Sequence, residues 1–451
     1  MRIFILTFIC FLIAVPYSAA AEKYLDIKEI KTNSGITVWL VEDHSLPIIS
    51  MDFSFKGAGS IRNTSKKQGT ARLLSNMLDE GAGELKSQEF QKQLSDHSIS
   101  LSFGSGRDNF GGSLKTLTRH KEKAFELLKL TLTKPRFDQE PLNRMRDANI
   151  ARIRNSMGKP DWIKARIFND KAFENHPYAL NSGGTITSLN KITADDLQNH
   201  MKEWLTLDHL HIGIMGDITA QEVTQMVEDV FSGLPRTREK KPVEKIEIQN
   251  QKTAFLYEKD IPQTMITIAM PAFDNLDPDY YALQIMNYIY GGSGFGSRLM
   301  AEAREKRGLT YGIYSSHSHQ DYIDYLSIGT STKRQSTSEM LDIIYTEMDK
   351  IKQTPVETQT LQDAKSYLTG SIPLSLTSTD RISSMLLSLQ MNERPADYLD
   401  TYSDKINAVT AEDVQKVAKR VLDKNKAIVV MVGKPENIVN LEIVETVPNV
   451  E

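Results

Sequence analysis

The chain has 451 residues, of which 40% are hydrophobic and 25% are charged, the profile of a water-soluble globular protein with more than one domain. Its formal net charge is -4, from 54 Lys and Arg against 58 Asp and Glu, so no basic surplus points to nucleic acid. No run of about eighteen apolar residues occurs, which excludes a membrane-spanning helix.

Residues 1–21 have the pattern of a removable secretory signal peptide. Arg2 gives a positive start, Ile3–Val15 is apolar except for one threonine, and Ala19–Ala21 provides an A-x-A cleavage site. The only cysteine, Cys10, lies inside this leader, so the mature chain has no disulfide and no thiolate metal ligand. We expect export, to the periplasm if the source is a Gram-negative bacterium, with no stable membrane insertion after the leader is removed.

The first half of the mature chain mixes strand and helix patterns. Apolar and polar residues alternate in 49–55 and again in 98–103, which predicts two half-buried strands. Helical spacing predicts helices over 68–79, 121–131 and 141–156. Strands followed by helical hairpins indicate an α+β sandwich rather than a parallel doubly wound sheet.

The chain also repeats itself at an offset of 217 residues. Residues 192–197 (ITADDL) resemble residues 409–414 (VTAEDV), and the same offset carries Gly216 onto Gly433, each of which ends an apolar run. Each copy predicts a helix with a threonine N-cap and then a buried strand closed by glycine. Two homologous domains are therefore expected.

The boundary between the two copies is predicted where the chain becomes charged and proline-bracketed, at PRTREKKP. We accordingly expect an N-terminal domain over 22–235, a linker over 236–252 and a C-terminal domain over 253–451.

The histidines do not form a helical zinc motif, because none of the nine lies three or four residues from another. His209 with His211, and His317 with His319, place two imidazoles on one face of a strand. This spacing is compatible with metal binding, but no third ligand is implied, and packed or surface histidines are the simpler interpretation.

The most glycine-rich segment, 291–297, contains Gly291, Gly292, Gly294 and Gly296. It lacks the lysine of a P-loop, the glycine spacing of a dinucleotide-binding loop and the final glycine of a nucleophile elbow. We interpret it as a flexible backbone loop in which catalysis by Ser293 is not expected.

Arg304 and Tyr311 flank the run EKRGLT, with Gly308 predicted as the end of a helix and Tyr311 as the start of a strand. A guanidinium and a phenol that converge could hold a peptide carbonyl or an oxyanion. From composition alone, a surface ion pair for Arg304 and a packed ring for Tyr311 are the better explanation.

The sequence resembles the insulinase/pitrilysin family of zinc peptidases, which includes mitochondrial processing peptidase. Residues 69–78 (GTARLLSNML) are similar to the family's G-T-A-H-x-x-E-H-M-L segment, and residues 291–314 are similar to its glycine-rich loop, its R-E-K-R-G-L-x-Y run and the following strand. The resemblance covers essentially the whole mature chain. It implies two tandem homologous α/β sandwich domains, in agreement with the repeat.

The sequence departs from the family pattern at the positions of the zinc ligands and the catalytic base. Arg72 stands at the position of the first zinc histidine, Ser75 at that of the catalytic glutamate and Asn76 at that of the second histidine. The third ligand, a glutamate about 75 residues further on in the family pattern, falls at Arg152. Zinc needs three protein ligands, so no catalytic zinc is expected in this chain.

The other half of the family's site is retained. In the family, an arginine and a tyrosine with the spacing of Arg304 and Tyr311 reach across to the zinc-bearing half and bind substrate backbone. Family members also bind peptide by strand addition, which the resemblance places at 98–112 here, although the glycines of that segment weaken it as a strand.

These features predict a non-catalytic subunit of an exported two-chain zinc metalloendopeptidase, inactive alone. Its expected partner is a paralogue with H-x-x-E-H that carries the zinc, and its substrate a peptide or unfolded protein. The alternatives are an inert peptide-binding or scaffold pseudo-enzyme and, with less support, a self-sufficient hydrolase that uses His209 and His211.

Overall fold

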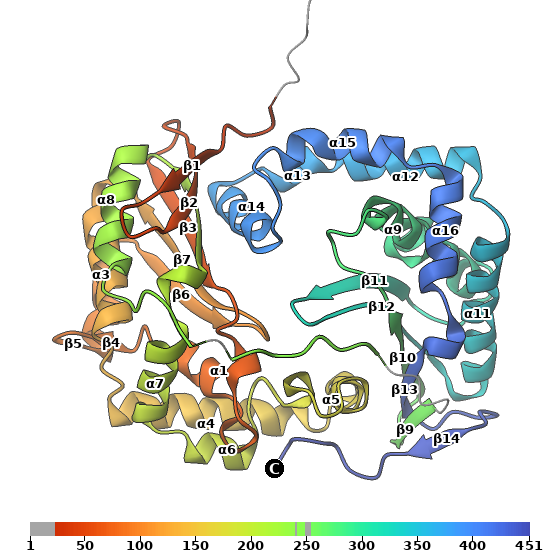
Figure 1. Cartoon of the computed structure of the whole chain (residues 1–451). Coiled ribbons are helices and arrows are strands. Elements are labelled where there is room, and N and C mark those ends of the chain that lie inside the picture. Colours follow the sequence, from red (N-terminus) through yellow and green to blue (C-terminus); the bar gives the residue numbers. More distant parts are fainter. Residues whose placement is uncertain (1–22, 240, 249–253) are drawn as a thin grey trace, which may run out of the picture.

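The computed structural model describes residues 23–239, 241–248 and 254–451 and contains two six-stranded sheets, one in each half of the chain (Figure 1). The predicted signal peptide lies outside the described residues. Within the described ranges, no helix combines the length and apolar character needed to cross a bilayer.

The first sheet has the order β1-β2-β8-β3-β7-β6 and is antiparallel except for the pair of β2 and β8. The predicted strand over 49–55 is confirmed as β3, and the one over 98–103 overlaps β6. The strands are β1 (Lys28–Lys31), β2 (Thr37–Glu42), β3 (Ile48–Phe55), β6 (Ser100–Ser105), β7 (Phe110–Leu117) and β8 (Leu210–Gly216), and β4 (Gly81–Ala82) pairs separately with β5 (Leu85–Lys86).

The second sheet repeats this arrangement, with the order β11-β12-β10-β13-β9-β14. Strand β8 ends at Gly216 beside its parallel partner β2, and β13 ends at Gly433 beside its parallel partner β9, an offset of 433 - 216 = 217. The repeat inferred from the sequence is therefore confirmed in the sheets. The strands are β9 (Ala254–Glu258), β10 (Gln263–Pro271), β11 (Ile313–Gln320), β12 (Ile323–Lys333), β13 (Ile428–Gly433) and β14 (Leu441–Ile443).

Helices cover both sheets, and the predicted helices over 121–131 and 141–156 are confirmed as α3 and α4. The first half contributes α1 (Thr70–Ser75), α2 (Ser87–Asp96), α3 (Lys121–Thr133), α4 (Gln139–Ser156), α5 (Pro160–Ala172), α6 (Ile186–Lys191), α7 (Ala194–Trp204) and α8 (Ala220–Phe231). The second contributes α9 (Tyr280–Asn287), α10 (Arg298–Met300), α11 (Thr337–Gln353), α12 (Thr358–Gly370), α13 (Ile372–Ser375), α14 (Thr379–Met391), α15 (Tyr398–Ala408) and α16 (Ala411–Val421).

The predicted helix over 68–79 is shorter in the structure, because only α1 is regular. After Asn76 the backbone tightens into turns, with the N–H of Met77 donating to the carbonyl of Leu74 at 2.9 Å and that of Glu80 to the carbonyl of Met77 at 3.2 Å. The α1 residues at the degenerate metal positions therefore lie at the end of a short helix.

The repeated threonine motif caps α7 and α16 in the same way. The Thr193 side chain accepts from the N–H of Asp196, and the Asp196 carboxylate in turn accepts from the N–H of Thr193. Thr410 and Asp413 form the same reciprocal pair at the start of α16. Both boxes satisfy N–H groups that a helix leaves unpaired at its start.

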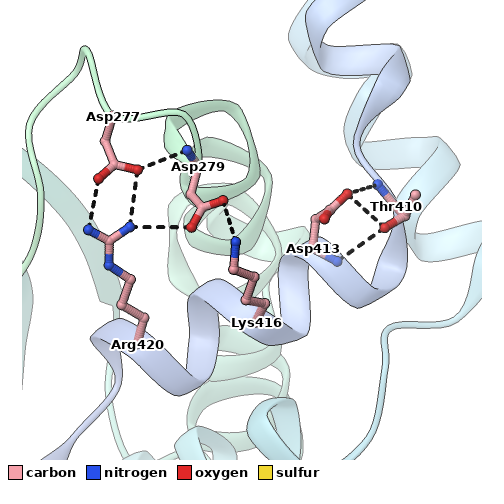
Figure 2. A network of polar contacts seen from close by, with 6 residues as sticks. All are labelled: Asp277, Asp279, Thr410, Asp413, Lys416 and Arg420. Atoms are coloured by element: carbon pink, nitrogen blue, oxygen red, sulfur yellow. Dashed lines mark hydrogen bonds and ion pairs between the residues drawn. The ribbon is translucent and has the colours of Figure 1, made fainter.

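Charged pairs then fix α16 against the segment that precedes α9 (Figure 2). Arg420 makes a two-pronged contact with Asp277, at 2.7 and 3.0 Å, and Lys416 contacts Asp279 at 3.0 Å. The Arg420 guanidinium also lies 3.9 Å from the ring centroid of Phe273. Planar bidentate pairing of this kind orients the two elements as well as attracting them.

Each half contributes one helix that packs on the sheet of the other half. On α5, Ile163, Ile167 and Phe168 pack with Val430 and Val432 of the second sheet. Conversely, α14 of the second half packs on β8 and β3 of the first sheet, beside Trp39 and Met215. Each central strand is thus covered on both faces, which explains why 428–432 is an unbroken apolar run.

The C-terminal segment also returns to the first half. Val450 is buried in the first core, and its carbonyl accepts from the N–H of Ile186 at 3.0 Å. Within the described part of the predicted linker, residues 241–248 run between the halves (Figure 1), and the N–H of Ile246 donates to the carbonyl of Tyr322. The domain boundaries at 235 and 253 stay a prediction.

Candidate functional site

The degenerate metal positions lie on α1, which is set close to the segment 181–184. Gly69 precedes the helix with φ 90°, and a Cβ there would lie 2.8 Å from the Cα of Gly184. Glycine is required at such a left-handed position with so close a backbone approach. This contact fixes where the side chains that follow on α1 point.

Asn76 and Arg152 are connected through Asn149, a residue that the sequence analysis did not single out. The Asn149 amide donates to Asn76 Oδ1 at 3.0 Å, and Arg152 Nη1 donates to Asn149 Oδ1 at 3.0 Å. Arg72 lines the same pocket as Asn149 and Arg152. Because Asn149 and Arg152 are three residues apart on α4, helical spacing would have placed them on one face.

Ser75 takes no part in this pocket. Its side chain is buried, and its hydroxyl donates to the carbonyl of Arg72 at 2.8 Å within the same helix. It therefore caps its own helix turn and does not point to any reacting group.

The residues at this position do not fit a zinc ion. A guanidinium has no lone pair to donate and repels a cation, and the Asn76 carbonyl oxygen is already engaged by Asn149. Among the described residues, no group of three His, Cys, Asp or Glu side chains could hold a metal ion.

We predict that restoring the motif alone does not restore metal. The variant Arg72→His, Ser75→Glu, Asn76→His supplies two ligands and a base, but Arg152 keeps a positive charge where a third ligand is needed. Elemental analysis of the purified variant should find no stoichiometric zinc. Adding Arg152→Glu should bring one zinc per chain, whereas full loading of the triple variant would contradict the assignment of Arg152.

Arg304 lies at the end of a π-helical segment, Ala301–Glu305, and stacks on Phe295 of the glycine-rich loop. Its guanidinium carbon is 4.2 Å from the ring centroid of Phe295, whose side chain is 63% exposed. The helix ends as predicted at Gly308, which has φ 62° and donates its N–H to the carbonyl of Arg304. The loop thus supports the guanidinium from one side.

The glycine-rich loop is itself helical in part. Its Gly291 and Gly292 end a π-helical segment, Tyr288–Gly292, and Gly294 and Gly296 bound a 3-10 turn. A Cβ at Gly291 would lie 2.7 Å from the backbone nitrogen of Ser315 on β11. The loop therefore packs directly against the strand that follows Tyr311.

Tyr311 precedes the strand rather than starting it, because β11 begins at Ile313. The Thr310 hydroxyl accepts from the N–H of Gly312 at 3.0 Å and turns the chain there. The Tyr311 side chain is 83% exposed. In the described part of the chain, no hydrogen bond or ring contact joins Tyr311 to Arg304, which is only partly exposed.

The two histidine pairs differ in their surroundings. His319 Nδ1 lies 2.6 Å from Asp324 Oδ1, and His317 Nε2 lies 3.0 Å from the carbonyl oxygen of Phe273. Burial lowers the pKa of His211, which favours its neutral form. His209 lies beside Asp208. The contacts of His317 and His319 account for that pair without a ligand, whereas among the described residues the buried His209 Nδ1 has no hydrogen-bond partner.

The expected peptide-binding edge corresponds to β6 and β7. Strand β6 is the last strand of the first sheet, next to β7, and packs beside α1. Its outer backbone groups lie at the open edge of the sheet, where an extended peptide could add as a further strand.

Comparison with known proteins places the chain among peptidase relatives. The family model described as "Insulinase (Peptidase family M16)" matches residues 55–185, and the model described as "Peptidase M16 inactive domain" matches residues 191–368. Together the two models cover well over half of the chain.

Individual relatives are similar over most of their length. "Non-peptidase homolog YmxG" of Helicobacter pylori is 26% identical over 79% of this chain and 81% of its own. "Mitochondrial-processing peptidase subunit beta" of Saccharomyces cerevisiae is 21% identical over 87% of this chain and 88% of its own. A crystal structure of a "peptidase M16 inactive domain" from Pseudomonas fluorescens superimposes with a TM-score of 0.83, at 26% identity, over 93% of this chain and 100% of its own.

Proposed function

This chain belongs to the insulinase family of peptidases, family M16, and we propose that it is the non-catalytic subunit of a two-chain metalloendopeptidase. One observation carries the proposal: the metal and base positions hold Arg72, Ser75 and Asn76, whereas Arg304 and Tyr311 are kept, with Tyr311 83% exposed and Arg304 partly exposed. A chain that merely lost activity has no use for an arginine and a tyrosine kept at this spacing.

The partner would be a paralogue that carries H-x-x-E-H and binds the zinc. A two-chain arrangement is supported by the yeast relative, which is named as a subunit. Hydrolysis would take place at the partner's metal. This chain would close the chamber and donate hydrogen bonds from Arg304 and Tyr311 to the backbone of a peptide or unfolded segment.

The proposed compartment is the periplasm, reached through the leader over 1–21. Mass spectrometry of the exported chain should give an N-terminus at Glu22.

We expect peptide cleavage only when the two chains are combined. The mature chain, an H-x-x-E-H paralogue and their mixture should be purified separately and assayed with a quenched fluorescent peptide. The mixture should elute as a heterodimer and cleave, and the present chain alone should be silent. Cleavage by this chain alone, with stoichiometric zinc, would overturn the proposal.

A second candidate function is a scaffold or peptide-binding pseudo-enzyme. It is favoured by the relative named a non-peptidase homologue. In that case the chains would assemble or bind peptide, and the mixture would cleave no faster than the partner alone.

A further inference from the structure

The degenerate metal positions Arg72 and Arg152 line a pocket of about 270 Å³ between α1, α4 and the segment 181–183. It lies at the end of the edge strand β6, which contributes Ser105. The lining contains several hydrogen-bond donors and no carboxylate. The polar residues of the lining that matter here are Arg72, Ser105, Asn149, Arg152, Ser156 and Ser182.

The two arginines bring positive charge into this pocket without a counter-ion. Neither Arg72 nor Arg152 has an Asp or Glu oxygen within ion-pair distance in the part of the chain that the structure describes. Burial, and then the neighbouring charge of Arg152, lower the pKa of Arg72. Two like charges held beside each other repel, so the arrangement is unfavourable unless a negative group joins them.

The other polar groups of the pocket are also suited to an anion. Within the described ranges, the hydroxyls of Ser156 and Ser182 make no hydrogen bond to another protein group, and Arg152 makes only the bond to Asn149. Hydroxyls and guanidinium N–H groups are all donors to a negatively charged oxygen. Trp162 and Ile153 add an apolar wall.

We propose that this pocket binds an oxyanion, a carboxylate or phosphate group held between Arg72 and Arg152. The planar guanidinium fork matches the two oxygens of either group and is charged at all physiological pH values. A peptide along β6 could bring its C-terminal carboxylate to Ser105, and free phosphate is the other source of the same chemistry. The inference does not rest on the two-chain proposal, because it concerns the isolated chain.

The test is calorimetric titration of the purified mature chain at low ionic strength. The probes are inorganic phosphate and an N-acetylated tripeptide with a free C-terminal carboxylate, and the amide of that tripeptide serves as the uncharged comparison. The variants are Arg72→Met and Arg152→Met. Arg154→Met is the matched control, since Arg154 is an exposed arginine on the same helix that does not line the pocket.

Each pocket variant should weaken binding at least roughly tenfold, the loss expected for one charge-assisted hydrogen bond, while Arg154→Met leaves it unchanged. Added salt should weaken binding as well. Binding of phosphate identifies a free ion, and binding of the tripeptide acid but not its amide identifies a peptide end; either supports the site. Absence of both at millimolar concentration overturns it, as does equal weakening by Arg154→Met. Arg152 is exposed, so Arg152→Met decides the matter if Arg72→Met does not fold.

Discussion

Replacing Tyr311 by phenylalanine is expected to lower kcat/KM of the reconstituted two-chain peptidase by roughly 10²–10³. A carbonyl gains negative charge as it is attacked, and a donor aimed at that oxygen stabilises the transition state more than the bound substrate. Losing one such donor typically costs about 2.7–4 kcal/mol. The change removes one hydroxyl from a side chain that is 83% exposed and that makes no hydrogen bond or ring contact with the described residues.

The control for this prediction is Tyr257→Phe. Tyr257 lies on β9, near the opposite edge of the same sheet, and loses the same hydroxyl. Heterodimer formation must first be shown to be unchanged in both variants. If Tyr311→Phe stays within about twofold of the unmodified complex, below roughly 0.4 kcal/mol, Tyr311 is no transition-state donor. The scaffold function would then be the better account.

Arg304→Ala is a less specific probe than Tyr311→Phe, because the guanidinium stacks on Phe295. Removing it also takes away packing against the glycine-rich loop, so a loss of rate would combine two effects. Two variants, Arg304→Lys and Phe295→Leu, separate the effect of the guanidinium from that of its packing. The first retains the charge without the planar fork, and the second removes the aromatic ring on which Arg304 stacks.

The sequence predicted those parts of the fold that depend on local pattern. Thr193 and Thr410 predicted the starts of their helices, because an N-cap depends only on residues a few positions away. The alternation in 49–55 and the apolar run before Gly433 likewise predicted strands, since side-chain period and burial are written into adjacent residues.

The sequence could not predict tertiary contacts between elements that lie far apart in the chain. The apolar run before Gly433 predicted that β13 is a buried strand, but not that α5 of the other half covers one of its faces. Asn149 is an ordinary polar residue on a helix until α1 is placed beside it. The stacking of Phe295 on Arg304 depends in the same way on how the glycine-rich loop folds back.

The packing of α14 on the first sheet leads to the second large predicted effect, a loss of stability when Gly213 is replaced. A Cβ at this position of β8 would lie 2.4 Å from the carbonyl oxygen of Ser383 and 2.8 Å from the nitrogen of Leu387, both in the backbone of α14. Backbone cannot move aside as a flexible side chain can. We therefore expect Gly213→Ala to lower the free energy of unfolding by about 3 kcal/mol, the upper part of the range for overpacking.

Gly329→Ala is the matched control, because Gly329 also lies in a central strand, β12, but a Cβ there meets nothing within 4 Å. Alanine in an open strand position should be neutral or stabilise the fold by about 0.5–1 kcal/mol. Urea unfolding followed by tryptophan fluorescence measures the difference, since Trp39 packs in the cluster that contains α14. Hydrogen exchange locates it: peptides from α14 should exchange faster in Gly213→Ala, while those from α5 keep their protection. Equal stability of the two variants would mean that α14 can shift away from β8 at little cost, and that α5 and α14 do not hold the halves in register.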